Sequence, residues 1–172
     1  NDRLKIQFDK FPGQHRGGLF PEREHRLQID LLQLVFSILT QVFQEDITVE
    51  MQHRWYESYR ARPNAFMFIV ESGGAKAGCM GFRLTDGGAA DTYNMIAAPA
   101  EKGKGLMKAA MLMMCSHIAE RHTKDIGCLV VKSNPAVKYY EHCGYKIVGD
   151  GGDHHILKLD WTRFTPVPYE MI

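Results

Sequence analysis

The chain has 172 residues, of which 45% are hydrophobic and 24% charged, so it is the size of one soluble domain. Its net charge is +1, and lysine and arginine are scattered rather than grouped into a basic stripe, which argues against nucleic acid as a partner. The longest apolar stretch, residues 27–43, is too short and too polar to span a bilayer, so we expect no membrane partner.

The four cysteines lie far apart and form no C-x-x-C pair, which excludes the usual zinc-ribbon and redox motifs. We therefore predict no metal, and buried thiols in a cytoplasmic protein. The chain begins at Asn1 rather than Met, so a missing leader and a larger parent protein are both possible.

The N-terminal part reads as two regions. Residues 1–24 are expected to be an extension or an extra strand, because Leu4, Ile6 and Phe8 alternate before glycines and prolines break the pattern. Residues 25–172 are expected to form a single domain.

Two helices are predicted next. Apolar residues recur at helical spacing over residues 27–38. Thr48 can cap a second helix, with Glu50 favourably placed in its first turn, that runs towards Pro63.

The central part alternates like β-structure. Residues 65–71, 77–85 and 92–97 predict three strands, and the glycine-containing turns between them indicate an antiparallel meander.

The rest of the chain mixes helices and strands. Helices are predicted over residues 105–122 and 135–143, and strands over the ranges 126–132, 146–148 and 155–159. The long helix can act as a crossover that makes its flanking strands parallel. The expected fold is α/β (α+β), with a mixed, mostly antiparallel central sheet of about seven strands and helices on both faces.

A glycine loop, residues 99–107, lies between a predicted strand and the long helix. Backbone amides and the positive helix end converge there, and Lys102 and Lys104 add charge, so the loop could bind an anion. It matches neither the Walker nor the Rossmann glycine pattern, and taken alone it is better read as a surface turn.

This loop resembles the [Q/R]-x-x-G-x-[G/A] motif of the GNAT superfamily of N-acetyltransferases. Here the pattern is Lys102-x-x-Gly105-x-Met107, with lysine in place of glutamine or arginine and a bulky methionine at the last position. The resemblance implies the GNAT fold, and loop amides that hold the pyrophosphate of acetyl-coenzyme A.

A second segment strengthens the resemblance. Residues 134–145 are similar to the family's N-x-x-A-x-x-x-Y-E-x-x-G-[F/Y] pattern, with one residue fewer between Asn134 and Tyr140. The resemblance implies that Tyr140 is the catalytic acid: a tyrosine stays protonated at neutral pH and can donate to a departing thiolate. The alternative is a tyrosine half-buried against the sheet.

The implied coenzyme A contacts come from three places. A splayed strand end could donate an amide to the thioester carbonyl, and the glycine loop and the tyrosine helix follow it. The residues are Met95, Ile96, Ala97, Lys102, Gly103, Lys104, Gly105, Leu106, Met107, Asn134 and Lys138.

The acceptor is expected to be a primary amine. Residues 47–56 loosely resemble a segment shared by ribosomal-protein acetyltransferases and by acetyltransferases of nucleotide-linked amino sugars, and the run Lys132-Ser133-Asn134 favours the sugar subgroup. Aromatic and amide side chains suit a sugar or base. The candidate pocket residues are Trp55, Tyr56, Tyr93, Asn94 and His155.

Several questions stay open at this stage. For Trp55 and Tyr56, core packing is an equal alternative. The general base could be Glu50, Glu57, Asp91 or His155. The alternatives to an amino-sugar enzyme are a protein N-terminal acetyltransferase and a non-catalytic domain that binds coenzyme A or a partner. A homodimer also stays open.

Overall fold

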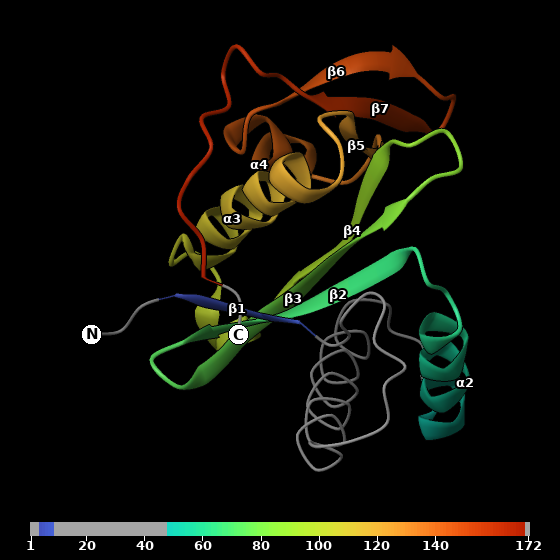
Figure 1. Ribbon diagram of the computed structural model, residues 1–172, viewed down its shortest axis with the longest axis vertical. Helices are drawn as coiled ribbons and strands as arrows, with labels where there is room; N and C mark the ends of the chain where they lie inside the picture. The colour runs from blue at the N-terminus through green and yellow to red at the C-terminus, as the bar shows by residue number, and fades with distance from the viewer. Residues whose placement is uncertain (1–3, 9–47, 171–172) are drawn as a thin grey trace.

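The computed structural model describes residues 4–8 and 48–170, so the helix predicted over residues 27–38 lies outside the described residues. Seven strands form one sheet in the order β1-β2-β3-β4-β5-β7-β6 (Figure 1). This mixed, mostly antiparallel sheet confirms the predicted fold class. The strands are β1 (Lys5–Phe8), β2 (Ala65–Ser72), β3 (Ala75–Leu84), β4 (Ala90–Ala97), β5 (Ile126–Val131), β6 (Tyr145–Asp150) and β7 (His154–Leu159).

The first four strands form an antiparallel meander. The predicted N-terminal strand is present, with Lys5 opposite Glu71 and Phe8 opposite Phe68. Residues 65–70 of β2 are all buried, which is why this strand reads as a continuous apolar run rather than an alternating one. The turn after β2 uses Gly73 and Gly74, both with positive φ.

The long helix α3 (Leu106–Arg121) connects β4 to β5. As expected of a crossover, it makes these strands parallel, with Ala90 opposite Ile126 and Asp91 opposite Gly127. The second helix, α4 (Val137–His142), follows β5 and leads into the antiparallel pair β6 and β7.

Helices cover both faces of the sheet (Figure 1). On one face, α3 and α4 pack over a large core that includes Phe68, Phe82, Met111 and Tyr145. On the other, α2 (Val49–Arg60) covers a smaller cluster around Tyr59. Thr48 caps α2 as predicted, because its hydroxyl accepts a hydrogen bond from the amide of Met51 at 3.2 Å.

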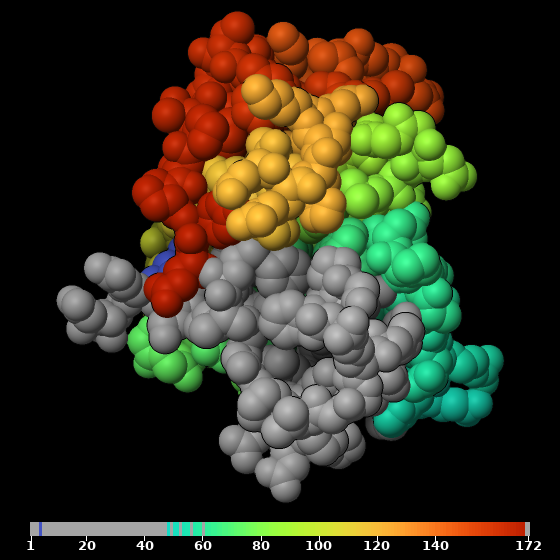
Figure 2. All heavy atoms as spheres, viewed as in Figure 1, coloured from blue at the N-terminus to red at the C-terminus, as the bar shows by residue number. Residues whose placement is uncertain are grey.

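Helix α3 is buried on more sides than its sequence suggests. Its core-facing methionines are buried, and Ser116 and His117 are buried as well. The C-terminal segment explains this, because the amide of Val167 donates to the Ser116 hydroxyl at 2.9 Å. Figure 2 shows these C-terminal residues, in red, lying against α3.

Two further details differ from expectation. A short 3₁₀ helix, η1 (Pro99–Glu101), follows β4. Helix α4 begins at Val137 rather than at residue 135, because the Asn134 side chain accepts from the amide of Ala136 at 2.9 Å and forms a turn. None of the helices in the described part of the chain is long and apolar enough to cross a membrane.

Candidate active site

The site is built where β4 and β5 separate. Their register covers Ala90 and Asp91 of β4 and goes no further. At the next residue, a side-chain hydrogen bond takes the place of a backbone one: the Thr92 hydroxyl donates to the carbonyl of Gly127 at 3.2 Å. Beyond this vertex the backbone of β4 is free of β5 on that side, and a ligand could enter between the two strands.

A β-bulge lies on β4 just past the vertex. Cys79 of β3 is opposite Ile96 and Gly81 is opposite Tyr93, so β4 carries one extra residue between these pairs. The irregular backbone is at Asn94, which has a φ of +53°. No other non-glycine residue in the described part of the chain has a positive φ. The irregularity directly precedes the segment 95–97, which the sequence predicted as a splayed strand end, and Ile96 and Ala97 themselves pair regularly with β3.

The glycine loop presents free backbone donors. Gly103 and Gly105 have φ of +80° and +77°, and Gly105 caps the start of α3. Within the described part of the chain, no hydrogen bond is made by the amides of residues 103 and 105–108. Nothing lies within 4 Å of the position that a Cβ on either glycine would occupy. Open space above a row of free amides at a helix start suits a pyrophosphate.

The two lysines of the loop are not equivalent. Lys104 Nζ lies 3.0 Å from both carboxylate oxygens of Glu101, which offsets its charge. Lys102 is exposed and forms no ion pair with any residue that the structure describes. The cation at the loop that remains available to a phosphate is therefore Lys102.

Met107, the bulky departure from the family motif, is accommodated by a glycine on the sheet. A Cβ on Gly78 of β3 would lie 2.6 Å from Met107 Sδ and 2.3 Å from the carbonyl oxygen of Ile96. The methionine side chain therefore lies against β3, in space left by the missing Cβ. Sequence reasoning missed Gly78, although a glycine inside a buried strand is itself a signal of close approach.

Three tyrosines lie together beside α4, and their hydroxyls differ. The Tyr139 hydroxyl donates to the carbonyl of Met107 at 2.8 Å. The Tyr145 hydroxyl lies 3.2 Å from that of Thr92. The Tyr140 hydroxyl forms no hydrogen bond with any described residue, although the side chain is 8% exposed. Of the three, only this group is left for a ligand.

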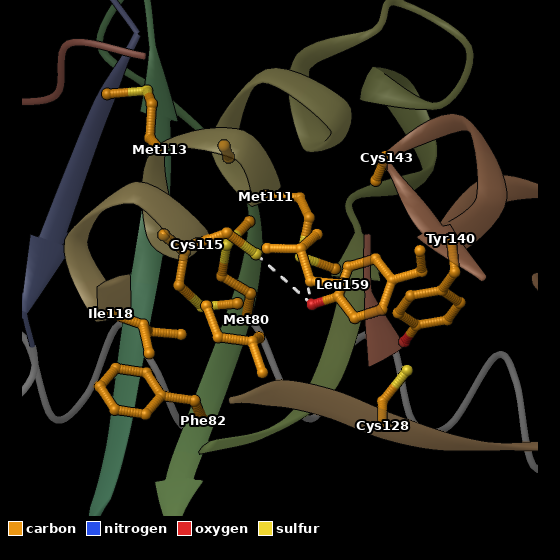
Figure 3. Packing of buried hydrophobic residues seen from close by; sticks show 14 of the residues in the cluster. Met80, Phe82, Met111, Met113, Cys115, Ile118, Cys128, Tyr140, Cys143 and Leu159 are labelled. Atoms are coloured by element: carbon orange, nitrogen blue, oxygen red, sulfur yellow. Dashed lines mark hydrogen bonds between the residues drawn. The ribbon is translucent and has the colours of Figure 1, made fainter. Parts of the chain in front are cut away.

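The surroundings of Tyr140 keep it protonated. Burial is the main cause that raises the pKa of Tyr140 above its usual value. Its hydroxyl points towards Cys128 of β5 (Figure 3). Burial raises the pKa of Cys128 to about 12, so this neighbour is a neutral thiol and a poor nucleophile.

Three of the predicted acceptor residues lie together on the α2 face. Trp55 stacks on Tyr59, with ring centroids 5.7 Å apart, and Tyr93 packs against the same cluster. Asn94 Nδ2 lies 4.0 Å from Met67 Sδ in that cluster. Trp55 packs on the core, as one of its two predicted roles requires, and stays partly exposed, so its role in a pocket remains a prediction.

The other two acceptor candidates are Tyr56 and His155. The side chain of Tyr56 lies outside the described residues. His155 lies on β7, opposite Val130, and β5 separates that strand from β4.

The remaining candidates are placed as follows. Asn134 uses its side-chain oxygen in the turn before α4, and Lys138 is exposed on α4. Of the candidate bases, Glu50 bonds Arg54 at 2.5 Å and Asp91 pairs with Arg83 at 2.8 Å. No group of three or more potential metal ligands occurs among the described residues.

Comparison with known proteins identifies the family and the shared fold. A sequence model of the acetyltransferase (GNAT) family matches residues 32–145. A search among curated proteins found no match.

Solved structures share the fold. The N-acetyltransferase PseH of Campylobacter jejuni with acetyl-coenzyme A superposes with a TM-score of 0.64 at 17% identity, covering 92% of this chain and 99% of that one. PaiA N-acetyltransferase of Thermoplasma acidophilum with coenzyme A gives 0.63 at 10% identity, covering 92% and 99%. A spermidine N-acetyltransferase chimera of Vibrio cholerae SpeG and hSSAT gives 0.62 at 20% identity, covering 76% and 88%.

Because the family model matches more than half of the sequence, the chain belongs to the GNAT acetyltransferase family and is an acyl-coenzyme A-dependent N-acyltransferase.

Proposed function

We propose that this protein transfers an acetyl group from acetyl-coenzyme A to the primary amine of a small molecule, in particular an amino sugar linked to a nucleotide, with Tyr140 as the general acid. The observation that carries the proposal is the Tyr140 hydroxyl, which is unpaired among the described residues and is directed towards β5 where β4 and β5 diverge (Figure 3).

The loop after β4 would hold the coenzyme. The amides of residues 103 and 105–108 are unpaired among the described residues, and the space beside Gly103 and Gly105 is open. Lys102 supplies positive charge, so the pyrophosphate is expected there. The thioester would then lie between β4 and β5, with its carbonyl oxygen near the amides of Met95 to Ala97. Asn134 and Lys138 lie at the start of α4 and would flank the same ligand.

The chemistry needs one proton donor and one proton acceptor. The neutral amine attacks the thioester carbon, a C–N bond forms, and a backbone amide stabilises the oxyanion. Collapse breaks the C–S bond, and the thiolate takes the proton of Tyr140, giving coenzyme A. The proton lost by the amine passes to a base or to water, and solvent reprotonates the tyrosinate. Because burial raises the Tyr140 pKa, the acid form is present at neutral pH.

The acceptor side supports a planar or ring-shaped substrate. Trp55 and Tyr93 are partly exposed aromatics on the α2 face, and Asn94 adds an amide at the bulge. Aromatic rings stack on sugars and bases, and an amide can hydrogen-bond to hydroxyl groups.

The test is coenzyme A release from acetyl-coenzyme A with three acceptor panels: nucleotide-linked amino sugars, polyamines and short peptides. We expect release with the sugars, and a kcat about 10² to 10⁴-fold lower in Tyr140→Phe at an unchanged KM for acetyl-coenzyme A. Tyr169→Phe is the matched control, because it removes a hydroxyl bonded to Glu120 at the far end of α3 and should keep the wild-type kcat.

Each other outcome points elsewhere. Release with peptides alone would replace the sugar by a protein N-terminus, and release with polyamines alone would give a polyamine enzyme. Coenzyme A binding without release in any panel would favour a non-catalytic domain. An unchanged kcat in Tyr140→Phe would remove the tyrosine from the mechanism. If Tyr140 is the acid, kcat should fall on the alkaline side only above the usual tyrosine pKa of about 10.

A further inference from the structure

Two polar side chains are buried at the vertex where β4 and β5 separate. Thr92 is 3% exposed and Tyr145 is 0% exposed, in a region otherwise made of apolar and sulfur-containing residues. Polar groups buried this deeply are normally held by hydrogen bonds. Here the Thr92 hydroxyl is 3.2 Å from the carbonyl of Gly127 and 3.2 Å from the Tyr145 hydroxyl.

The same hydroxyl of Tyr145 reaches helix α3. It lies 3.4 Å from Cys115 Sγ and 3.9 Å from Met111 Sδ, the two residues whose hydrogen bonds are drawn in Figure 3. Tyr145 therefore joins the vertex of the two strands to the helix above it. Burial raises the pKa of Tyr145 far above its usual value, so this hydroxyl keeps its proton and stays a donor.

The Tyr140 ring packs against the ring of Tyr145. The Tyr140 and Tyr145 rings meet edge to face, with centroids 5.6 Å apart and planes at 78°. The ring of Tyr139 also meets that of Tyr140 edge to face, with centroids 5.5 Å apart. The Tyr140 hydroxyl forms no hydrogen bond with a described residue, so its direction depends on how the ring packs in the core.

We propose that Tyr145 and Thr92 are positioning residues for the reaction: their shared hydrogen bond fixes the Tyr145 ring at the vertex, and that ring aims the Tyr140 hydroxyl at the space between β4 and β5. This inference rests on the proposed role of Tyr140 as general acid. A phenylalanine would fill the same core volume as Tyr145, so the hydroxyl is the part of the side chain that the proposal explains.

The experiment compares Tyr145→Phe in two backgrounds. In the wild type we expect kcat to fall about tenfold, because a small misplacement of a catalytic group is costly, with the KM for acetyl-coenzyme A changed by less than about twofold. In a Tyr140→Phe background, Tyr145→Phe should lower kcat no further, because it acts through the lost hydroxyl. Equal losses in both backgrounds would mean a merely structural role and would overturn the proposal.

Substitutions of Thr92 supply a second test. Thr92→Val keeps the shape of the side chain and removes the hydroxyl, so it should lower kcat as Tyr145→Phe does, whereas Thr92→Ser should restore it. Tyr169→Phe, which loses a tyrosine hydroxyl far from the vertex, should leave kcat unchanged. Failure of serine to restore kcat would contradict the role of the hydroxyl.

A spectroscopic readout separates this proposal from the proposed function. In protein labelled with 3-fluorotyrosine, the ¹⁹F resonance of Tyr140 can be assigned through Tyr140→Phe and followed as coenzyme A is added. We expect Tyr145→Phe to move or broaden this resonance, and Tyr169→Phe to leave it unchanged. This signal needs no acceptor. An unmoved resonance would overturn the positioning role even if the enzyme is active, and a moved one would support it even if every acceptor panel fails.

Discussion

Strand β4 pairs with its two neighbours to different extents. Towards β3 it is paired along its whole length, from Ala90 opposite Leu84 to Ala97 opposite Gly78. Towards β5 the pairing ends after Asp91. On the β3 side the backbone pairing is continuous apart from one bulge, whereas on the β5 side it ends after the first two residues.

The difference leaves unpaired backbone inside the sheet rather than at an exposed edge. The side paired to β3 supports the bulged backbone, so the residues after Asn94 stay in place although they lack a partner on β5. Gly78 makes this possible, because only a glycine there leaves room for the Ile96 carbonyl and the Met107 sulfur. One side of the strand therefore supports the backbone, and the other lines the candidate site.

The largest expected effect comes from filling that space. Gly78→Ala would bring a Cβ to 2.3 Å from a backbone oxygen, which a side-chain rotation cannot relieve. We expect a loss of about 3 kcal/mol in the free energy of unfolding, the upper end for overpacking, measured by urea denaturation. Gly87→Ala is the control, because the nearest atom to its Cβ would be at 3.9 Å. Equal stability of the two variants would mean that the close approach of β3 and β4 is wrong.

The stability of the protein should depend on pH through a histidine that packs over β2 and β3, on the side of the sheet where β4 is paired. His117 of α3 packs against the rings of Phe68 and Phe82, and burial, aided by His122 and Arg121, lowers its pKa from 6.5 to about 4. Between these values the unfolded chain binds a proton that the folded chain does not, so stability is complete above pH 6.5 and falls as the pH drops towards 4.

The size of this effect is about 2 kcal/mol after allowance for solvent screening. His117→Phe keeps an aromatic ring and removes the titration, so its melting temperature should decline less than that of the wild type between pH 6.5 and pH 4. Parallel declines in the two proteins would show that other groups account for the acid sensitivity.

The smallest expected effect separates backbone strain from ligand binding. Gly105 and Gly88 have φ of +77° and +79°, and neither has an atom within 4 Å of its Cβ position. Alanine at either site should cost about 1 kcal/mol of stability, because both backbones are left-handed. Only Gly105→Ala should also weaken the binding of coenzyme A, because its methyl group enters the space over the loop amides. The Kd measured by calorimetry should rise about tenfold. Equal affinity in both variants would place the pyrophosphate elsewhere.

Local patterns predicted most of the elements. The apolar run of β2, the glycine turns and the cap at Thr48 lie where the sequence placed them, because each depends on residues that are near one another in the chain. The boundaries of α4 shifted because the Asn134 turn competes with the helix for the first residues. The double-sided burial of α3 could not be foreseen, because the segment that covers it lies about fifty residues away in sequence.

The sequence by itself determined the order of the strands along the chain, the crossover helix and the glycine loop, through spacing and local chemistry. The choice of Tyr140 came from the resemblance to the family motif and stays a prediction. The tertiary structure decided what those residues face: it paired Lys104 with Glu101, left the Tyr140 hydroxyl without a partner among the described residues, and placed His155 away from Trp55 and Tyr93. It also joined Thr92, Gly127 and Tyr145 at one vertex. Contacts between residues so distant in sequence depend on how the strands pack, which no local pattern encodes.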